Sequence, residues 1–144
     1  MFQSLLIATA FDATSRAAER QALHLARLTQ ARCVLVHAIE PIGRDVSEPT
    51  DPEVEAFYET LRKKAQEQLA SAAKPFQEAG LEVELVVEVG RRWEVIVAQA
   101  AARGVDLIVV GSGPLMVEGR PRLSTTSHQV YLAADRPVLA VRTG

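Results

Sequence analysis

The chain has 144 residues, of which 48% are hydrophobic and 24% are charged, and its formal net charge is -2. This length suits one domain with a buried core over residues 1–144, and the composition is that of a globular protein rather than a disordered chain. Because tight binding of nucleic acid requires a basic surface, the charge argues against nucleic acid as a partner.

Cysteine content and apolar runs bear on where the protein works. The single cysteine, Cys33, lies within an apolar run and cannot form an intrachain disulfide. No apolar run approaches the roughly 20 residues that a membrane span needs. The N-terminal segment also lacks the basic region of a signal peptide. We therefore expect a cytoplasmic protein with no membrane partner.

The first half of the chain alternates short apolar runs with amphipathic patterns. The run over 5–8 predicts a strand, and the spacing of apolar residues over 18–26 predicts a helix. A second apolar run over 33–39 predicts a strand that ends before a proline. A polar connection then leads into a long helix over 51–79, which Pro75 is expected to kink or end.

The second half repeats the same alternation. Apolar and acidic residues partly alternate over 81–89, which predicts a strand near a sheet edge. A third helix follows and ends at Gly104. The run over 107–110 predicts a fourth strand, 123–133 a fourth helix, and 138–141 the last strand.

Five strands that alternate with four helices indicate a doubly wound α/β fold, with a parallel sheet covered on both faces. In such folds a ligand binds at the carboxyl ends of the strands, where the strand order reverses. We therefore expect the loops after Ala8, Val36 and Val110 to surround one cleft.

The stretch Gly111-Ser112-Gly113-Pro114 directly follows the fourth predicted strand. A strand that runs into a glycine-rich loop is typical of a phosphate-binding site, because the backbone N–H groups there reach phosphate oxygens. The proline removes one such N–H. Whether this loop still holds a phosphate is the main question that the sequence raises.

Four segments, in this order and spacing, resemble the universal stress protein family. They are Leu6–Thr9, Val36–Pro41, Ala102–Ser112 and Arg136–Arg142, and the resemblance spans residues 4–142. It implies a Rossmann-like fold similar to that of adenine nucleotide alpha hydrolases. It also implies a homodimer formed through the last strand, 138–141, and, in one branch of the family, ATP in the cleft.

The ATP-binding branch carries a G-x-x-G motif, nine further residues, and then G-[S/T]. Gly111 matches the first glycine, but Pro114 replaces the second and Ser124 replaces the third. ATP-binding relatives also have an aspartate where this chain has Ala10. The nearest acidic residue, Asp12, either caps the first helix or meets a ligand, and the sequence leaves both readings open.

Positional match with the family assigns nucleotide contacts, mostly through backbone groups. The candidate residues are Ala8, Thr9, Ala10, Ala38, Val110, Gly111, Ser112, Pro114, Ser124, Thr125 and Thr126. If an anion binds, Arg120 or Arg122 could support it through charge-assisted hydrogen bonds. The alternative is that these arginines are solvated, as we also expect for Arg91 and Arg92.

Other reactive side chains have ordinary structural interpretations. The three histidines show no metal-ligand spacing, and His37 is expected to be a hydrogen-bonded structural residue. The hydroxyl cluster over 124–127 lacks a neighbouring base and is expected to cap the fourth helix. Trp93 is expected to pack in the core. We therefore predict no catalytic and no metal-binding residues.

Three functions remain open. We favour a dimeric cytoplasmic binding or regulatory module of the stress response, with weak ATP binding or none and no certain cofactor. The second is a universal stress protein that binds ATP or AMP in the cleft. The third, a slow ATPase or nucleotidyl-transfer enzyme, lacks a P-loop lysine, a carboxylate pair for a metal and an evident base.

Overall fold

Five parallel strands form one sheet in the order β3-β2-β1-β4-β7. The computed structural model describes residues 2–41, 51–114, 116–121 and 125–143. The strands are β1 (Ser4–Ala8), β2 (Arg32–Ile39), β3 (Val83–Val89), β4 (Leu107–Ser112) and β7 (Val138–Arg142). This topology confirms the predicted doubly wound α/β fold, and β3 lies at one edge of the sheet as expected.

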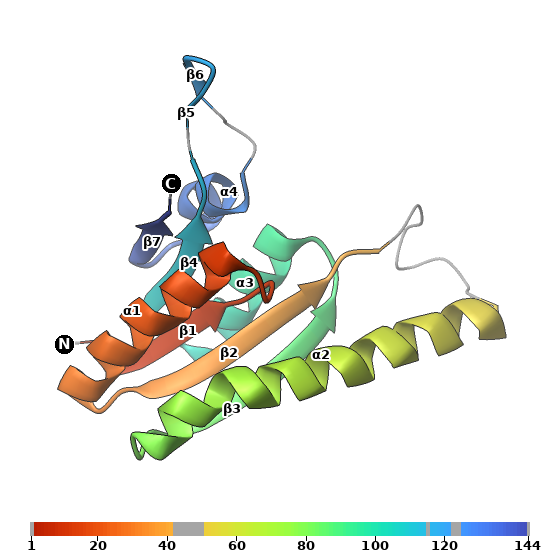
Figure 1. Cartoon of the computed structure of the whole chain (residues 1–144), viewed down its shortest axis with the longest axis horizontal. Coiled ribbons are helices and arrows are strands. Elements are labelled where there is room, and N and C mark those ends of the chain that lie inside the picture. The colour runs from red at the N-terminus through yellow and green to blue at the C-terminus, as the bar shows by residue number, and fades with distance from the viewer. Residues whose placement is uncertain (1, 42–50, 115, 122–124, 144) are drawn as a thin grey trace.

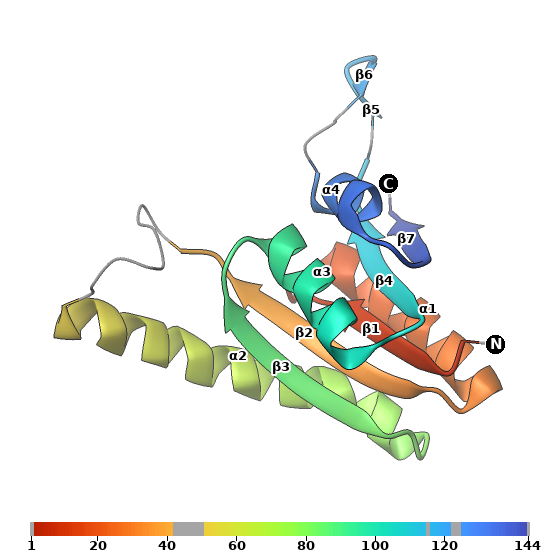
Figure 2. The ribbon, with the colours of Figure 1, turned by 180° about the vertical axis from the view of Figure 1, so that it is seen from behind.

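Helices cover both faces of the sheet. α1 (Ala13–Thr29) and α2 (Pro52–Glu78) lie in front of the sheet in Figure 1, and α3 (Arg92–Arg103) and α4 (Thr126–Ala133) lie in front of it in Figure 2. Side chains of a strand alternate between its two faces. Leu5 and Ile7 of β1 therefore join the core beneath α1 and α2, and Leu6 joins the core beneath α3 and α4.

The helix ends follow the capping signals of the sequence. Asp12 accepts a 2.8 Å hydrogen bond from the Ser15 N–H, so it caps α1. Asp51 caps α2 in the same way, with Pro52 at the first helical position. Gly104 ends α3 with a φ of +60°, a conformation that glycine adopts without strain.

One prediction about α2 is wrong in part, because the helix continues through Pro75 for three more residues to Glu78. A proline removes the hydrogen bond to the carbonyl four residues earlier, here that of Ser71. Both residues are exposed, so water can replace the lost bond near the end of the helix. Neither α2 nor any other helix within the described residues is long and apolar enough to cross a bilayer.

β4 runs two residues further than predicted. Gly111 and Ser112 are strand residues that pair with Val141 and Arg142 of β7, so only the second half of the GSGP stretch is a loop. The fourth helix begins with Thr125 as its N-cap. Its predicted start over residues 123–124 lies outside the described residues.

A short antiparallel hairpin, β5 (Met116–Val117) and β6 (Arg120–Pro121), is absent from the sequence prediction. Its two turn residues, Glu118 and Gly119, have φ values of 51° and 75°. A pair of positive φ values is typical of the tight turns that join hairpin strands. The hairpin projects away from the sheet beyond α4 (Figures 1 and 2).

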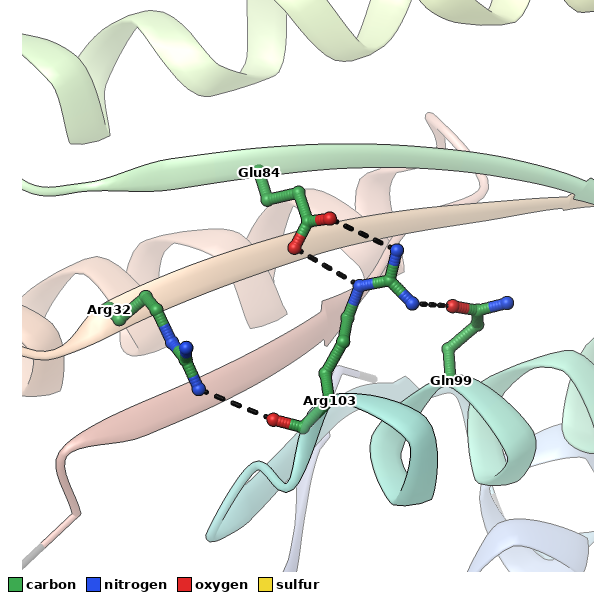
Figure 3. A network of polar contacts seen from close by, with 4 residues as sticks. All are labelled: Arg32, Glu84, Gln99 and Arg103. Atoms are coloured by element: carbon green, nitrogen blue, oxygen red, sulfur yellow. Dashed lines mark hydrogen bonds and ion pairs between the residues drawn. The ribbon is translucent and has the colours of Figure 1, made fainter.

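A polar network fastens the end of α3 to the edge of the sheet (Figure 3). The Arg103 guanidinium donates two hydrogen bonds, of 3.1 and 3.0 Å, to the carboxylate of Glu84 on β3. It also donates to the side chain of Gln99, one turn earlier in α3. Arg32 of β2 donates a 3.3 Å hydrogen bond to the Arg103 carbonyl. The network thereby joins β2, β3 and α3.

Candidate functional site

A cavity of about 370 Å³ lies at the carboxyl ends of β1, β2 and β4. Its walls come from these strand ends and from the first residues of α1, α3 and α4. In a parallel sheet with right-handed crossovers, each helix begins near the carboxyl end of the strand before it. The positive ends of three helix dipoles therefore point toward this cleft, which favours a negatively charged ligand.

The loop between β1 and α1 satisfies its own backbone donors. The Ala10 N–H donates a 2.8 Å hydrogen bond to Ser15 Oγ, and the Phe11 N–H donates to Thr9 Oγ1 at 3.2 Å. The Thr9 N–H donates to the Val36 carbonyl at 2.9 Å. The backbone N–H groups of Thr9, Ala10 and Phe11 are therefore already engaged within the protein.

Asp12 supplies a negative charge at the cleft wall. The backbone N–H of Ser15 holds the pKa of its carboxyl below the usual value, and the Arg92 guanidinium acts in the same direction. Asp12 is thus the cap of α1 and also lines the cleft, and its contact with a ligand stays a prediction.

Hydroxyl groups line the opposite wall, at the start of α4. Ser127 Oγ donates to Ser112 Oγ at 3.2 Å, and the hydroxyls of Thr125 and Ser127 lie 3.3 Å apart. Thr125 Oγ1 accepts a 3.3 Å hydrogen bond from the His128 N–H, which confirms the predicted capping role of the cluster at this residue. The N–H groups of Thr126 and Ser127 lie in the first turn of α4 and therefore have no acceptor within the helix.

The glycines of the GSGP stretch serve different purposes. A Cβ on Gly111 would lie 2.6 Å from the Thr14 carbonyl oxygen, so a glycine is needed there because α1 packs closely on β4. Gly111 thus has a packing role in addition to its place in the cleft lining, and its contact with a phosphate stays a prediction. At Gly113 nothing lies within 4 Å of a Cβ position, and the residue borders the cleft. Gly113 therefore leaves open space at the cleft wall.

His37 has the structural role expected of it. Its Nδ1 lies 2.8 Å from the Thr9 carbonyl oxygen, and its ring stacks on Phe11 with centroids 4.5 Å apart. Burial lowers the pKa of His37, which keeps the imidazole neutral. Within the described part of the chain, no group of three His, Cys, Asp or Glu side chains is placed to hold a metal ion.

A sequence model of the Universal stress protein family matches residues 1–142. The chain belongs to this family. A universal stress protein of Thermus aquaticus is 32% identical over 145 residues, covering 99% of this chain and 100% of the relative. The universal stress protein YxiE of Bacillus subtilis is 29% identical over 152 residues, with the same coverage of 99% and 100%.

Solved structures of universal stress proteins share this fold. The protein from Methanocaldococcus jannaschii superposes with a TM-score of 0.76 at 22% identity, covering 100% of this chain and 98% of that one. A universal stress protein in complex with cAMP has a TM-score of 0.67 at 22% identity, with coverage of 99% and 98%. The Archaeoglobus fulgidus protein in complex with dAMP has a TM-score of 0.67 at 23% identity, with coverage of 98% and 99%.

Most of the predicted candidates meet at the cleft of this universal stress protein. The nine that line it are Ala8, Thr9, Ala10, Ala38, Val110, Gly111, Ser112, Thr125 and Thr126. Pro114 is not among the lining residues, and Ser124 lies outside the described residues. Arg122 also lies outside them, and Arg120 belongs to the projecting hairpin rather than to the cleft, so this placement does not support an anion-binding role for Arg120.

Arg92 is one of the cleft residues that the sequence prediction missed, since it was expected to be solvated. It is the first residue of α3, lines the cleft and lies 3.7 Å from the Glu40 carboxylate. Its side chain remains 48% exposed, so it reaches the cleft from the solvent side. Ser127 also lines the cleft, although the sequence analysis considered it only as a capping residue. Its position in the hydroxyl cluster was the signal that could have placed it in the cleft.

Proposed function

We propose that this universal stress protein binds an adenine nucleotide of the monophosphate class and acts as a regulatory module. The main support is the cleft itself, whose volume of about 370 Å³ falls within the range of about 300–1,000 Å³ typical of small-molecule sites. The two solved universal stress proteins in complex with cAMP and dAMP carry ligands of this class.

The start of α4 suits the phosphate. The N–H groups of Thr126 and Ser127 sit at the positive end of a helix, beside the hydroxyls of Ser112 and Thr125. These neutral donors can surround one phosphate without a buried positive charge. The guanidinium of Arg92, on the solvent side of the cleft, adds a long-range attraction for the anion.

The other wall suits the base. Val36, Ala38 and Ile96 are buried apolar residues of the cleft lining, and Ala38 has only a small side chain. A flat aromatic base gains from apolar burial on such a wall. The carboxylate of Asp12 supplies an acceptor for a ribose hydroxyl or an exocyclic amine.

One departure from the ATP-binding pattern favours a monophosphate over ATP. Pro114 has no N–H to donate and stands outside the cleft lining, so the loop offers fewer donors to a triphosphate chain. A single phosphate needs only the donors at the start of α4.

We propose that the protein binds its nucleotide without hydrolysing it. Asp12 is the one carboxylate among the described cleft residues, and its hydrogen bond to Ser15 already occupies one oxygen. Phosphoryl transfer depends on positioned metal ions and a group that orients the attacking water. A slow ATPase or nucleotidyl transferase is therefore less well supported than a binding module.

Isothermal titration calorimetry tests the proposal. We expect AMP and cAMP to bind with micromolar affinity, and ATP to bind at least tenfold more weakly. Arg92→Gln should weaken AMP binding at least fivefold, whereas the matched change Arg91→Gln, outside the cleft, should leave it unchanged. Absence of heat with millimolar AMP and cAMP would overturn the proposal.

We also propose a homodimer formed through β7, in a protein that works in the cytosol. β7 is an edge strand, and Tyr131 and Leu132 on neighbouring α4 are each 69% exposed. An unpaired edge with apolar side chains beside it favours association with a second copy. The cytosol is consistent with the single free cysteine among the described residues, Cys33, whose thiol pKa burial raises to about 11.

Sedimentation velocity tests the dimer. Hydrogen bonds from the Ile108 N–H to the Pro137 carbonyl and from the Thr143 N–H to the Ser112 carbonyl show which residues of β7 face β4. By alternation, the N–H of Ala140 faces the free edge. Ala140→Pro should therefore give a folded monomer, and a wild-type protein that is monomeric at 100 micromolar would contradict the dimer.

A further inference from the structure

A second cavity, of about 410 Å³, lies between α1 and α2 on the face of the sheet opposite α3 and α4. Both helices pack on the sheet, and Figure 1 shows them side by side over it. The residues that border the cavity belong to α1, to α2 and to the loop before α1. Phe11 borders this cavity, and its chain neighbours Ala10 and Asp12 border the cleft, but the two linings share no residue.

The floor of this second cavity is apolar. Phe11 and Leu23 are partly buried, Phe76 is 1% exposed, and all three belong to or pack against the core beneath α1 and α2. Ala72 adds only a methyl group on the α2 side, which leaves the space unfilled. Apolar surface of this kind gains free energy when an apolar ligand displaces water from it.

The rim carries a net positive charge. Arg16 and Arg20 lie one turn apart on α1, and Glu19 is the one acidic residue of the lining, so the sum of two arginines and one glutamate is +1. Burial raises the pKa of Glu19, whereas the Arg16 guanidinium, a hydrogen bond with the Thr9 side chain and the Arg20 guanidinium stabilise its charged form. The carboxylate is thus engaged both with the loop and with the rim arginines, whose charges it offsets only in part.

Among the described residues, no carboxylate lies within ion-pair distance of either rim arginine, although both arginines act electrostatically on the charged form of Glu19. The ion pairs found among the described residues involve Arg91, Arg92, Arg103 and Arg136, and not Arg16 or Arg20. Like charges four residues apart on a helix repel each other. An anion placed between Arg16 and Arg20 would relieve this repulsion and accept charge-assisted hydrogen bonds from both guanidinium groups.

We propose that this cavity is a second ligand site that takes a small amphiphilic organic anion. The apolar body of the ligand lies on Phe11, Leu23 and Phe76, and its carboxylate lies between Arg16 and Arg20. An apolar ligand body suits Phe11, Leu23 and Phe76 better than a sugar does, and the uncharged polar side chains of the lining, Gln68 and Ser71, both come from α2. The inference does not depend on nucleotide binding in the cleft, which has separate walls.

Octanoate and 1-octanol form a matched pair of probes that differ in the charge of the head group. Titration calorimetry should show octanoate binding at one site per chain, at least tenfold more tightly than 1-octanol. Arg16→Gln combined with Arg20→Gln should weaken octanoate binding at least tenfold and leave 1-octanol unchanged. Arg27→Gln, on the same helix but outside the cavity, is the control and should bind octanoate like the wild type.

A second variant separates this site from the cleft. Ala72→Phe should fill the cavity and remove binding of both probes, while AMP binding stays at the wild-type level. Thermal unfolding followed by circular dichroism verifies that each variant is folded. The proposal is overturned if octanoate does not bind at millimolar concentration, if 1-octanol binds equally well, or if the double arginine variant binds octanoate like the wild type.

Discussion

At the scale of single residues, Gly111 and Gly113 look alike in the sequence but meet different surroundings. Gly111 is a strand residue pressed against the first turn of α1, where a Cβ would lie 2.6 Å from the Thr14 oxygen and 2.7 Å from its Cγ2. Gly113 borders open space. The first glycine is therefore explained by packing, and the second is free to serve a ligand.

This difference predicts opposite effects of the same substitution. Gly111→Ala should lower the free energy of unfolding by about 1–3 kcal/mol, because backbone atoms of α1 must move to admit the methyl group. Gly113→Ala should leave it unchanged or raise it by up to about 1 kcal/mol, by restricting the unfolded chain. Urea unfolding of both variants measures the two values, and equal losses would contradict the packing explanation.

A second residue-scale prediction concerns His37 and pH. Burial lowers its pKa in the folded state, whereas the unfolded chain has the usual value near 6.5. Below about pH 6.5 the unfolded state therefore takes up a proton first, and stability falls as the pH drops toward the folded pKa. Above about pH 6.5, His37 is neutral in both the folded and the unfolded state, and its contribution to stability is fully present.

The measurement is the free energy of unfolding at pH 7.5 and pH 5.5, above the range in which ordinary carboxylates titrate. The wild type should be less stable at the lower pH. His37→Asn, which keeps a donor for the Thr9 carbonyl, should lose a clear part of this pH dependence. An identical pH dependence in the variant would show that His37 is not the titrating group.

At the scale of elements, α3 is held to the edge of the sheet by a paired charge at its C-terminus. Arg103 is 26% exposed and Glu84 is 53% exposed, so water screens this pair only partly. The contact is bidentate, which fixes its geometry and distinguishes it from a loose surface ion pair. Because β3 has a strand neighbour only on the β2 side, this link adds support where the sheet ends.

Glu84→Gln should lower the free energy of unfolding by about 0.5–1 kcal/mol at low salt, and by less in 1 M NaCl, where charges are screened. The control is Glu94→Gln, since Arg91 and Glu94 form a looser pair at 4.0 Å with both side chains largely exposed. That change should have no measurable effect. Equal effects of the two variants would mean that the bidentate geometry adds nothing.

At the scale of the whole molecule, the strand order gathers the starts of α1, α3 and α4 at one edge of the sheet. Residues from β1, β2 and β4, far apart in the chain, form one cavity there. A ligand bound in this cavity contacts several elements at once. It does not bind the unfolded chain, because the cavity exists only in the folded protein. Its binding should therefore stabilise the entire fold.

At an AMP concentration of 100 times the dissociation constant, the added stability should be about 2.7 kcal/mol. This corresponds to a rise in melting temperature of roughly 8 °C for a chain of this size, if each kcal/mol adds roughly 3 °C. Thermal unfolding followed by circular dichroism at increasing AMP concentration measures the shift, and dialysis should reverse it. A constant melting temperature would contradict binding of AMP to the folded state.

The sequence alone determined the alternation of strands and helices, because those signals are local. The uninterrupted apolar run of β1 predicts a strand buried on both faces, and Asp51-Pro52 and Gly104 mark helix ends through their own backbone preferences. The family resemblance then located most of the cleft residues, since position in this fold fixes which residues follow each strand. Nine of the candidates do line the cleft.

Only the tertiary structure decided which residues become neighbours. The need for a glycine at position 111 arises from Thr14, 97 positions earlier, and the cleft role of Arg92 arises from the place of α3 beside β1. The second cavity exists because α1 and α2 rest on the sheet without filling the space between them. These contacts depend on the crossover connections that bring distant segments together. They cannot be predicted from the GSGP stretch alone.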